Sequence, residues 1–204
     1  MAQNIKGVVI LGCNFAQVDG DEIYGFDKPG FNIGFASIMP FNEKENFNLS
    51  IETIFNQKGA YQKYPFEYDS VKCYPYYHLK LNYAEVPVLF QYTDKKIMTF
   101  ETGFSWGRLV QMTEIEHGSK VPWKIGAGPY DRNDWNILVG FKLRIYEKWH
   151  FNLRYAYSIK KIRTRQYDNG VYQWERDQYN NLVSFRICYI LNDSYKSLAK
   201  KKKK

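Results

Sequence analysis

Apolar and polar residues alternate at period two in eight stretches of this chain. The clearest runs lie near 47–55, 100–106, 137–145, 151–157 and 183–189. Period two predicts extended strands with one apolar and one polar face, and eight strands in succession indicate a closed antiparallel barrel. We expect the strands at about residues 5–16, 29–39, 46–58, 76–92, 97–109, 134–146, 149–161 and 179–191.

The connections between these strands alternate in length. Short polar turns are expected at 40–45, 93–96 and 146–148, and long connections at 17–28, 59–75, 110–133 and 162–178. Outer-membrane barrels have this pattern, with short periplasmic turns and long extracellular loops. A soluble lipocalin-like barrel would have mostly short hairpins, and its apolar face would line a cavity. We therefore predict an all-β fold: a single eight-stranded antiparallel up-and-down transmembrane β-barrel with four long extracellular loops, the lipocalin-like carrier being the alternative.

The composition agrees with a membrane barrel of one domain. The 204 residues fit one all-β unit, for which we assign 1–195 to the barrel and 196–204 to a basic disordered tail. No apolar run is long enough for a transmembrane helix. The mean hydropathy of -0.53 does not argue against a barrel, because half of each strand is polar. Aromatic residues make up 18% of the chain, which suits interfacial girdles or, alternatively, a Tyr-rich soluble sandwich.

The termini and cysteines add little chemistry. The net charge of +8 includes the run Lys200 to Lys204, which is either a solvated terminus or a segment attracted to acidic phosphates. Nothing else supports a nucleic-acid partner. Cys13, Cys73 and Cys188 have no metal-ligand spacing, so we expect neither a disulfide framework nor a metal or other cofactor. The first residues contain no signal peptide, which suits a mature outer-membrane chain whose signal has been removed.

The strand expected at 76–92 contains an irregularity. Apolar residues at 79, 81 and 83 share one phase, and those at 86, 88, 90 and 92 share the other. A slip of this kind beside Pro87 predicts a β-bulge around Ala84 and Glu85, after which Glu85 points to the polar side.

The polar faces of the strands carry charged residues in an ordered arrangement. They are Glu52, Lys80, Glu85, Glu101, Lys142, Arg144, Arg154 and Arg186. Apart from Lys80, the acids lie on the third to fifth strands and the bases on the sixth to eighth, which a closed barrel places opposite one another. Buried charges must pair, so we predict a structural charge network in which Glu52 and Glu101 engage Arg154 or Arg186 across the lumen. A proton or ion path is the alternative.

Four polar-face glycines, Gly12, Gly34, Gly103 and Gly140, would relieve crowding in a narrow lumen, or would mark ordinary bulges.

The histidines offer little for catalysis: His117 lies in a long loop, His78 near the rim and His150 at the opposite end, and no serine nucleophile motif accompanies them. We therefore expect no enzymatic activity.

The long loops are rich in aromatic residues. These are Tyr61, Tyr64, Phe66, Tyr68, Tyr74, Tyr76, Trp123, Tyr130, Tyr167, Tyr172 and Trp174. Exposed aromatics often mark contact surfaces, but they also pack together as a cap or lie in the headgroup belt.

Five segments, in order along the chain, form a recognisable series within about residues 6–191. They are Gly12 to Gly20, Gly30 to Phe35, Glu52 to Gly59, Tyr83-Ala84-Glu85-Val86-Pro87 and Leu153 to Tyr157. In this order they resemble the PorT-type outer-membrane β-barrel family of the Bacteroidetes. The resemblance implies an eight-stranded outer-membrane barrel without shared catalytic residues, and a link to type IX protein secretion through the member that names the family. The Lys-rich ending departs from the family's usual aromatic-terminated last strand.

The function we expect is that of an integral outer-membrane barrel with a structural or accessory role. Its lipid-facing surface would contact outer-membrane lipid, and its extracellular loops a partner protein, a glycan or lipopolysaccharide. A subunit of a secretion or assembly machine and the soluble carrier are the alternatives.

Overall fold

The computed structural model describes residues 5–23, 25–63, 66–68, 71–73, 76–116, 119–124, 128–168 and 170–192. The strands are β1 (Lys6–Asp19), β2 (Lys28–Pro40), β3 (Phe47–Lys63), β4 (Phe66–Tyr68), β5 (Val71–Cys73), β6 (Tyr76–Asp94), β7 (Met98–Glu116), β8 (Ser119–Lys120), β9 (Asn133–Tyr146), β10 (Trp149–Ser158), β11 (Arg163–Asp168) and β12 (Gln173–Ile190). Within this part of the chain no helix has the length and apolar character needed to cross a membrane.

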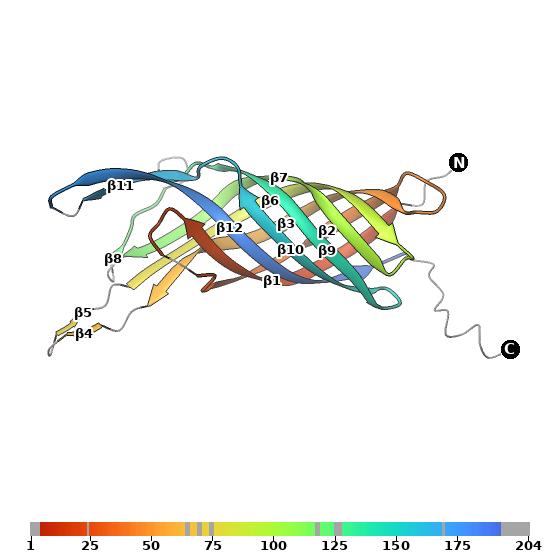
Figure 1. Ribbon diagram of the computed structural model, residues 1–204, viewed down its shortest axis with the longest axis horizontal. Helices are drawn as coiled ribbons and strands as arrows, with labels where there is room; N and C mark the ends of the chain where they lie inside the picture. The colour runs from red at the N-terminus through yellow and green to blue at the C-terminus, as the bar shows by residue number, and fades with distance from the viewer. Residues whose placement is uncertain are drawn as a thin grey trace.

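Eight of these strands form a closed antiparallel barrel. Their order is β1-β2-β3-β6-β7-β9-β10-β12, and β1 pairs with β12 to close the ring. The closing register runs from Val8 opposite Ile190 to Asp19 opposite Tyr179. The strands cross the barrel at a tilt (Figure 1). The predicted eight-stranded up-and-down barrel is therefore confirmed.

The two ends of the barrel differ as predicted. The turns β2–β3, β6–β7 and β9–β10 lie at one end, at the right of Figure 1, where β1 begins and β12 ends. The hairpins β4–β5 and β11–β12 and the short strand β8 lie at the other. We call these the short-turn end and the long-loop end.

The outer face of the barrel is apolar and its interior is polar. Seven side chains that the alternation assigns to lipid lie on the outer face: Leu49, Ile51, Phe104, Val139, Phe141, Leu153 and Phe185. Phe104 is 60% exposed, whereas Glu52 on the inner face is 1% exposed. A lipocalin has the reverse arrangement, so the alternative of a lipocalin-like carrier does not hold.

The predicted bulge in the strand at 76–92 is also wrong. β6 alternates without interruption, so that Leu79, Leu81 and Tyr83 point inward like Glu85. The irregularity lies in β7 instead, where Val110 is inserted between the partners of Asn82 and Tyr83. The apparent slip in the alternation arises because the inward-facing residues of β6 change from apolar, at Leu79, Leu81 and Tyr83, to charged at Glu85. Lys80 consequently points outward rather than into the lumen.

Several strands extend beyond their predicted ends at the long-loop end. β3 continues to Lys63, β7 to Glu116, and β12 begins at Gln173. β11 pairs with β12 from Arg163 opposite Gln178 to Asp168 opposite Gln173, inside the segment predicted as a loop. These extensions contain few apolar residues, which is why alternation of hydrophobicity did not reveal them. The basic tail predicted at 196–204 and His117 lie outside the described residues.

The long-loop end of the barrel is filled by an apolar cluster, which we call the apolar cap. It contains Val18, Ala60, Tyr77, Leu79, Leu81, Tyr83, Leu109, Met112, Tyr130 and Ile162, with Ile23 and Trp123 packed against it. Tyr130, a loop aromatic for which both a contact role and packing as a cap were left open, is therefore buried in the cap. Burial of this much apolar surface holds loop residues onto the barrel strands.

Candidate functional site

The half of the lumen nearer the short-turn end is crossed by ion pairs centred on Arg154 of β10. Its Nη1 and Nη2 atoms donate to the two carboxylate oxygens of Glu52, each at 2.8 Å, and its Nε and Nη2 atoms donate to Glu101 Oε1 at 2.9 and 2.6 Å. All three side chains are at most 4% exposed. One guanidinium thus joins β10 to β3 and to β7.

Arg186 of β12 adds a second cation to the same carboxylates. Its Nη1 lies 3.1 Å from Glu52 Oε2, and its Nη2 lies 3.4 Å from Glu101 Oε1. Its Nε donates at 2.7 Å to Asn152 Oδ1, and the Asn152 amide in turn donates to Glu101 Oε1 at 3.0 Å. Asn152 therefore orients both an acid and a base.

Two further side chains complete this group. Lys142 Nζ lies 3.6 Å from Glu101 Oε2, and Gln91 Nε2 donates to the same oxygen at 3.1 Å. We call Glu52, Glu101, Lys142, Arg154 and Arg186 the Arg154 cluster. Asn152 and Gln91 were not anticipated, although both lie at inward-facing positions of their strands.

Two of the four predicted lumen glycines lie directly against this cluster. A Cβ atom at Gly140 would come within 2.6 Å of Glu101 Oε1 and 2.8 Å of its Cγ. A Cβ atom at Gly12 would come within 2.6 Å of Arg186 Cγ. The absence of a side chain at these positions gives Glu101 and Arg186 the space they occupy.

A second group of charged side chains lies in the lumen closer to the long-loop end. Lys58 Nζ of β3 lies 2.7 Å from Glu85 Oε1 and 2.9 Å from Asp134 Oδ2. Asp134 also accepts hydrogen bonds from Ser158 and Asn180 at 2.6 and 2.8 Å. We call Lys58, Glu85 and Asp134 the Lys58 cluster.

The Lys58 cluster corrects the predicted separation of acids and bases. Lys58 places a base on an acidic wall and Asp134 an acid on a basic wall, and sequence reasoning missed both. They occupy the last and the first positions of their predicted strands, and their even numbers match the inward phase of Glu52 and Lys142. Together the two clusters hold four carboxylates and four cations, so their formal charges balance.

Arg144 does not join either cluster. It lies at the short-turn rim, where its Nε donates to the Lys96 carbonyl at 2.8 Å and its Nη1 to the Glu147 carbonyl. Its inward phase was predicted, but its position near the end of β9 puts it too close to the turns to reach the carboxylates. It links two neighbouring turns instead.

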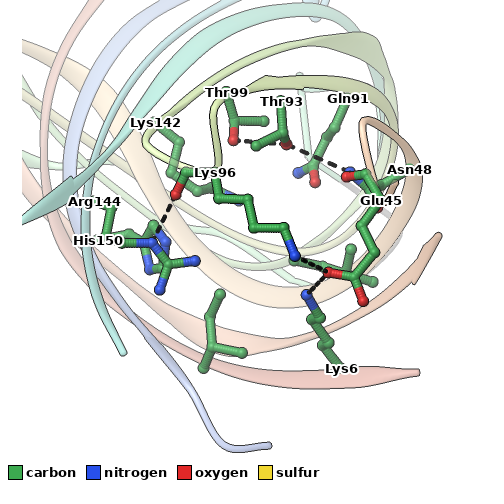
Figure 2. A pocket seen from close by; sticks show the side chains of 12 residues that line it. Lys6, Glu45, Asn48, Gln91, Thr93, Lys96, Thr99, Lys142, Arg144 and His150 are labelled. Carbon is green, nitrogen blue, oxygen red and sulfur yellow. Dashed lines mark hydrogen bonds and ion pairs between the residues drawn. The ribbon is translucent and has the colours of Figure 1, made fainter. Parts of the chain in front are cut away.

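A cavity of about 110 Å³ opens at this end of the barrel. We call it the mouth cavity. Its lining comprises Lys6, Ile38, Glu45, Asn48, Gln91, Thr93, Lys96, Thr99, Lys142, Arg144, His150 and Ile190. Figure 2 shows Lys6 and Lys96 pointing toward Glu45, with Arg144 and His150 to the other side. A cavity within the lumen, beside Glu85, Arg154 and Arg186, measures about 10 Å³.

Catalytic groupings are not evident among the described residues. His78 makes an edge-on contact with the Tyr61 ring, with centroids 5.6 Å apart, and His150 lines the mouth cavity at the opposite end. In the same part of the chain no group of three or more His, Cys, Asp or Glu side chains could hold a metal ion. Cys13 and Cys188 are free thiols, of which Cys13 is exposed and Cys188 is buried.

A comparison with known protein families identifies the family of this barrel. Residues 1–163 match the family described as outer membrane protein beta-barrel domain. The chain belongs to that family. The family's membrane location agrees with the apolar outer face, so the short-turn end is periplasmic and the long-loop end is extracellular. No curated protein matches the sequence significantly.

Solved barrels of this family's architecture share the fold at low sequence identity. Ail, the attachment invasion locus protein of Yersinia pestis, aligns with a TM-score of 0.52 and 13% identity, over 94% of this chain and 100% of Ail. Neisserial surface protein A aligns with a TM-score of 0.51 and 10% identity, over 90% of this chain and 96% of its own. A structure of Ail with the heparin analogue sucrose octasulfate aligns at a TM-score of 0.49. The barrel is thus an eight-stranded outer-membrane protein.

Proposed function

We propose that this outer-membrane barrel is a non-enzymatic structural or accessory protein that acts through its extracellular segments. The observation that carries the proposal is the filling of its interior. From the periplasmic side the Arg154 cluster, the Lys58 cluster and the apolar cap follow one another, and each is built from side chains at most 7% exposed. A filled lumen leaves the outer surfaces as the place for contact.

The β11–β12 hairpin is the extracellular segment best suited to such contact. It extends beyond the barrel body (Figure 1), and Val171 and Tyr172 at its tip are 77% and 72% exposed. Tyr167 and Trp174 stack with centroids 5.9 Å apart, which stiffens the hairpin below the tip. An ordered hairpin with an apolar and aromatic tip suits a protein, a glycan or lipopolysaccharide.

Site-specific photocrosslinking tests this role. A photoreactive residue at Tyr172 on living cells should give discrete adducts, whereas one at Phe41, beside a periplasmic turn, should give a different set. Adducts that vanish after Val171→Ser with the barrel still folded would support contact through the tip. Absence of adducts at Tyr172 under conditions that label Phe41 would contradict the proposal.

The filled lumen also leads us to propose that the barrel does not conduct solutes. Planar-bilayer recording of the purified monomer should show no large, steady conductance. Opening of a solute-permeable channel in the unmodified protein would remove the basis of the structural role.

The second candidate is a subunit of a secretion or assembly machine, which the resemblance to the PorT-type family favours. Extraction in mild detergent followed by native electrophoresis distinguishes the two roles. A machine subunit should migrate with a stoichiometric partner complex, and a lone barrel should migrate as a monomer.

A further inference from the structure

We propose that Asp21 is a proton-operated latch that holds the β1–β2 loop against the β11–β12 hairpin. The proposal concerns how firmly the hairpin is held, and it does not depend on what the hairpin tip contacts. Two features carry it: a buried carboxyl group with one oxygen that lacks a hydrogen-bond partner among the described residues, and an extracellular cavity of about 270 Å³ beside that group.

The cavity lies where the β1–β2 loop meets the hairpin and the extracellular ends of the barrel strands. Asp21, Glu22 and Ile23 of the loop line it, together with residues of β3, β6, β7 and β11. We call it the latch cavity. The loop and the first strand of the hairpin therefore form two walls of one space.

Three polar contacts join the loop to the hairpin around the latch cavity. The Tyr167 hydroxyl of β11 donates to the Gly20 carbonyl at 3.3 Å. Trp174 Nε1 of β12 donates to Glu22 Oε1, also at 3.3 Å, and Arg176 Nε lies 3.4 Å from the same oxygen. Exposed contacts of this kind contribute little free energy, so a small change inside the cavity is enough to separate the loop from the hairpin.

The backbone of the loop also lies directly on the hairpin. Gly20 has a φ of 87°, and a Cβ atom there would come within 2.3 Å of the Asp177 carbonyl oxygen. Asp177 is paired with Thr164 across the hairpin. The absence of a side chain at Gly20 thus allows the close approach that places the next residue, Asp21, against the base of the hairpin.

The Asp21 carboxyl group is buried in this contact without a full set of partners. The side chain is 6% exposed, and its Oδ1 accepts a hydrogen bond of 2.9 Å from the Ile23 amide. Its Oδ2 is buried, and no donor among the described residues reaches it. Burial disfavours the charged form and raises the pKa of this carboxyl group from 3.8 to about 7.

The charged and titratable groups that face Asp21 do not supply the missing partner. They are Asp19 and Glu22 on its own segment, Tyr77 on β6, Glu116 on β7, and Arg165 and Tyr167 on β11, while β3 contributes the uncharged Gln62. Arg165 pairs with Glu116 and lies over the rings of Tyr77 and Tyr167, with its Cζ 5.8 and 5.1 Å from the two centroids. Its guanidinium is therefore already engaged, and its attraction for Asp21 does not exceed the repulsion from Asp19.

Loss of the Asp21 proton consequently favours release of the hairpin from the loop. In the latched state the carboxyl group keeps its proton up to about pH 7, whereas in the released state it is hydrated and loses the proton to solvent near pH 4. Between these values each unit of rising pH favours release by about tenfold, and above about pH 7, where both states are ionised, the dependence ends. The latch is firm in acid and loose at neutral pH.

Trypsin cleavage of the bond after Arg165 measures the released state, because a strand that is paired with β12 and packed against the loop is a poor substrate. Initial rates are measured by mass spectrometry on the full chain in detergent. They are divided by the rates for a free peptide with the sequence of β11, which corrects for the pH dependence of trypsin itself. When the hairpin closes faster than trypsin cuts, this ratio follows the released population. We expect it to rise about tenfold per pH unit below pH 7 and to level off above.

Three variants, each checked for the folded barrel by heat-modifiable electrophoretic mobility, separate the latch from other effects. Asp21→Asn keeps the side chain neutral and should abolish the slope, leaving the bond protected at every pH. Glu175→Gln is the matched control, because it makes the same change on an exposed hairpin residue that accepts a hydrogen bond of 2.9 Å from Gln166, and it should keep the slope. Tyr167→Phe removes the donor to the Gly20 carbonyl and should raise the ratio roughly fivefold at every pH with the slope unchanged.

A ratio that does not depend on pH in the unmodified protein would overturn the proposal. A slope that persists in Asp21→Asn, or that Glu175→Gln removes to the same extent, would also overturn it. Asp19→Asn provides an independent check if Asp21→Asn does not fold. It removes a charge that raises the pKa of Asp21, so the levelling-off should move to lower pH, and an unmoved profile would contradict the latch.

Discussion

Arg154 of β10 and Glu52 of β3 form a two-pronged ion pair across the lumen, with both N–O distances at 2.8 Å. The pair is almost fully buried, so each partner depends on the other to offset its loss of hydration. Removal of one partner is therefore expected to cost more than removal of both.

Arg154→Met should destabilise the folded barrel by about 3–5 kcal/mol, because it leaves two buried carboxylates with one cation fewer. Adding Glu52→Gln or Glu101→Gln should recover part of this loss. Urea unfolding in detergent, followed by tryptophan fluorescence, measures the three variants. Strictly additive losses would show that the residues are not coupled.

Phe141→Arg should lower the free energy of unfolding by about 2–4 kcal/mol if the residue lies near the bilayer midplane. Phe141 lies on the outer face of β9 and packs against Phe100 with ring centroids 5.6 Å apart. Phe41→Arg, at a periplasmic turn, is the control, and its cost should be much smaller. Equal costs in lipid vesicles would argue against the assigned depth of the two positions.

Gly140→Ala should cost about 1–3 kcal/mol, because its Cβ atom overlaps Glu101, which the Arg154 cluster holds in place. Gly7→Ala is the matched control, since the nearest atom to a Cβ there is Leu191 Cδ1, at 3.2 Å and at the end of a flexible side chain. The same unfolding assay measures both. If the two alanine variants proved equally stable, the packing around Glu101 would be looser than the distances indicate.

Asp21, between β1 and β2, should titrate near neutrality. Burial raises the pKa of its carboxyl group from 3.8 to about 7, against the lowering effect of the hydrogen bond from the Ile23 amide. Asp19 raises this pKa and Arg165 lowers it. A ¹³C NMR titration of the Asp21 carboxyl carbon should give a midpoint near 7, and a midpoint near 4 would indicate a hydrated side chain.

The same shift predicts a pH dependence of stability. The folded state holds the Asp21 proton between about pH 4 and 7, where the unfolded chain has lost it, so the free energy of unfolding falls as the pH rises through this interval and then levels off. Asp21→Asn should remove that slope. A slope that persists unchanged in the variant would have another origin.

Alternation of apolar and polar residues accounts for the barrel, its strand order and the direction in which Glu52, Glu101, Arg154 and Arg186 point. It could not predict that Arg144 lies at the rim of the barrel. The phase of Arg144 is inward, but the residue is close to the short-turn end of β9. It also could not show that Leu79 and Leu81 line the lumen, because an apolar residue inside a membrane barrel has the same appearance in sequence as one facing lipid. Lys58 and Asp134 were within reach of the same phase argument, because they occupy the last and the first positions of their predicted strands and share the inward phase of Glu52 and Lys142.

The partners in the Arg154 cluster are far apart along the chain: Glu52 precedes Arg154 by 102 residues and Arg186 by 134. A sheet that has formed only β1 to β7 contains both carboxylates and none of the cluster's cations, which all lie on β9 to β12. Such a sheet could not enter hydrocarbon without unneutralised ions on its inner face. Completion of the last strand and loss of water from the interior should therefore be one event, so that an incompletely translated or truncated chain stops at the membrane surface instead of inserting in part.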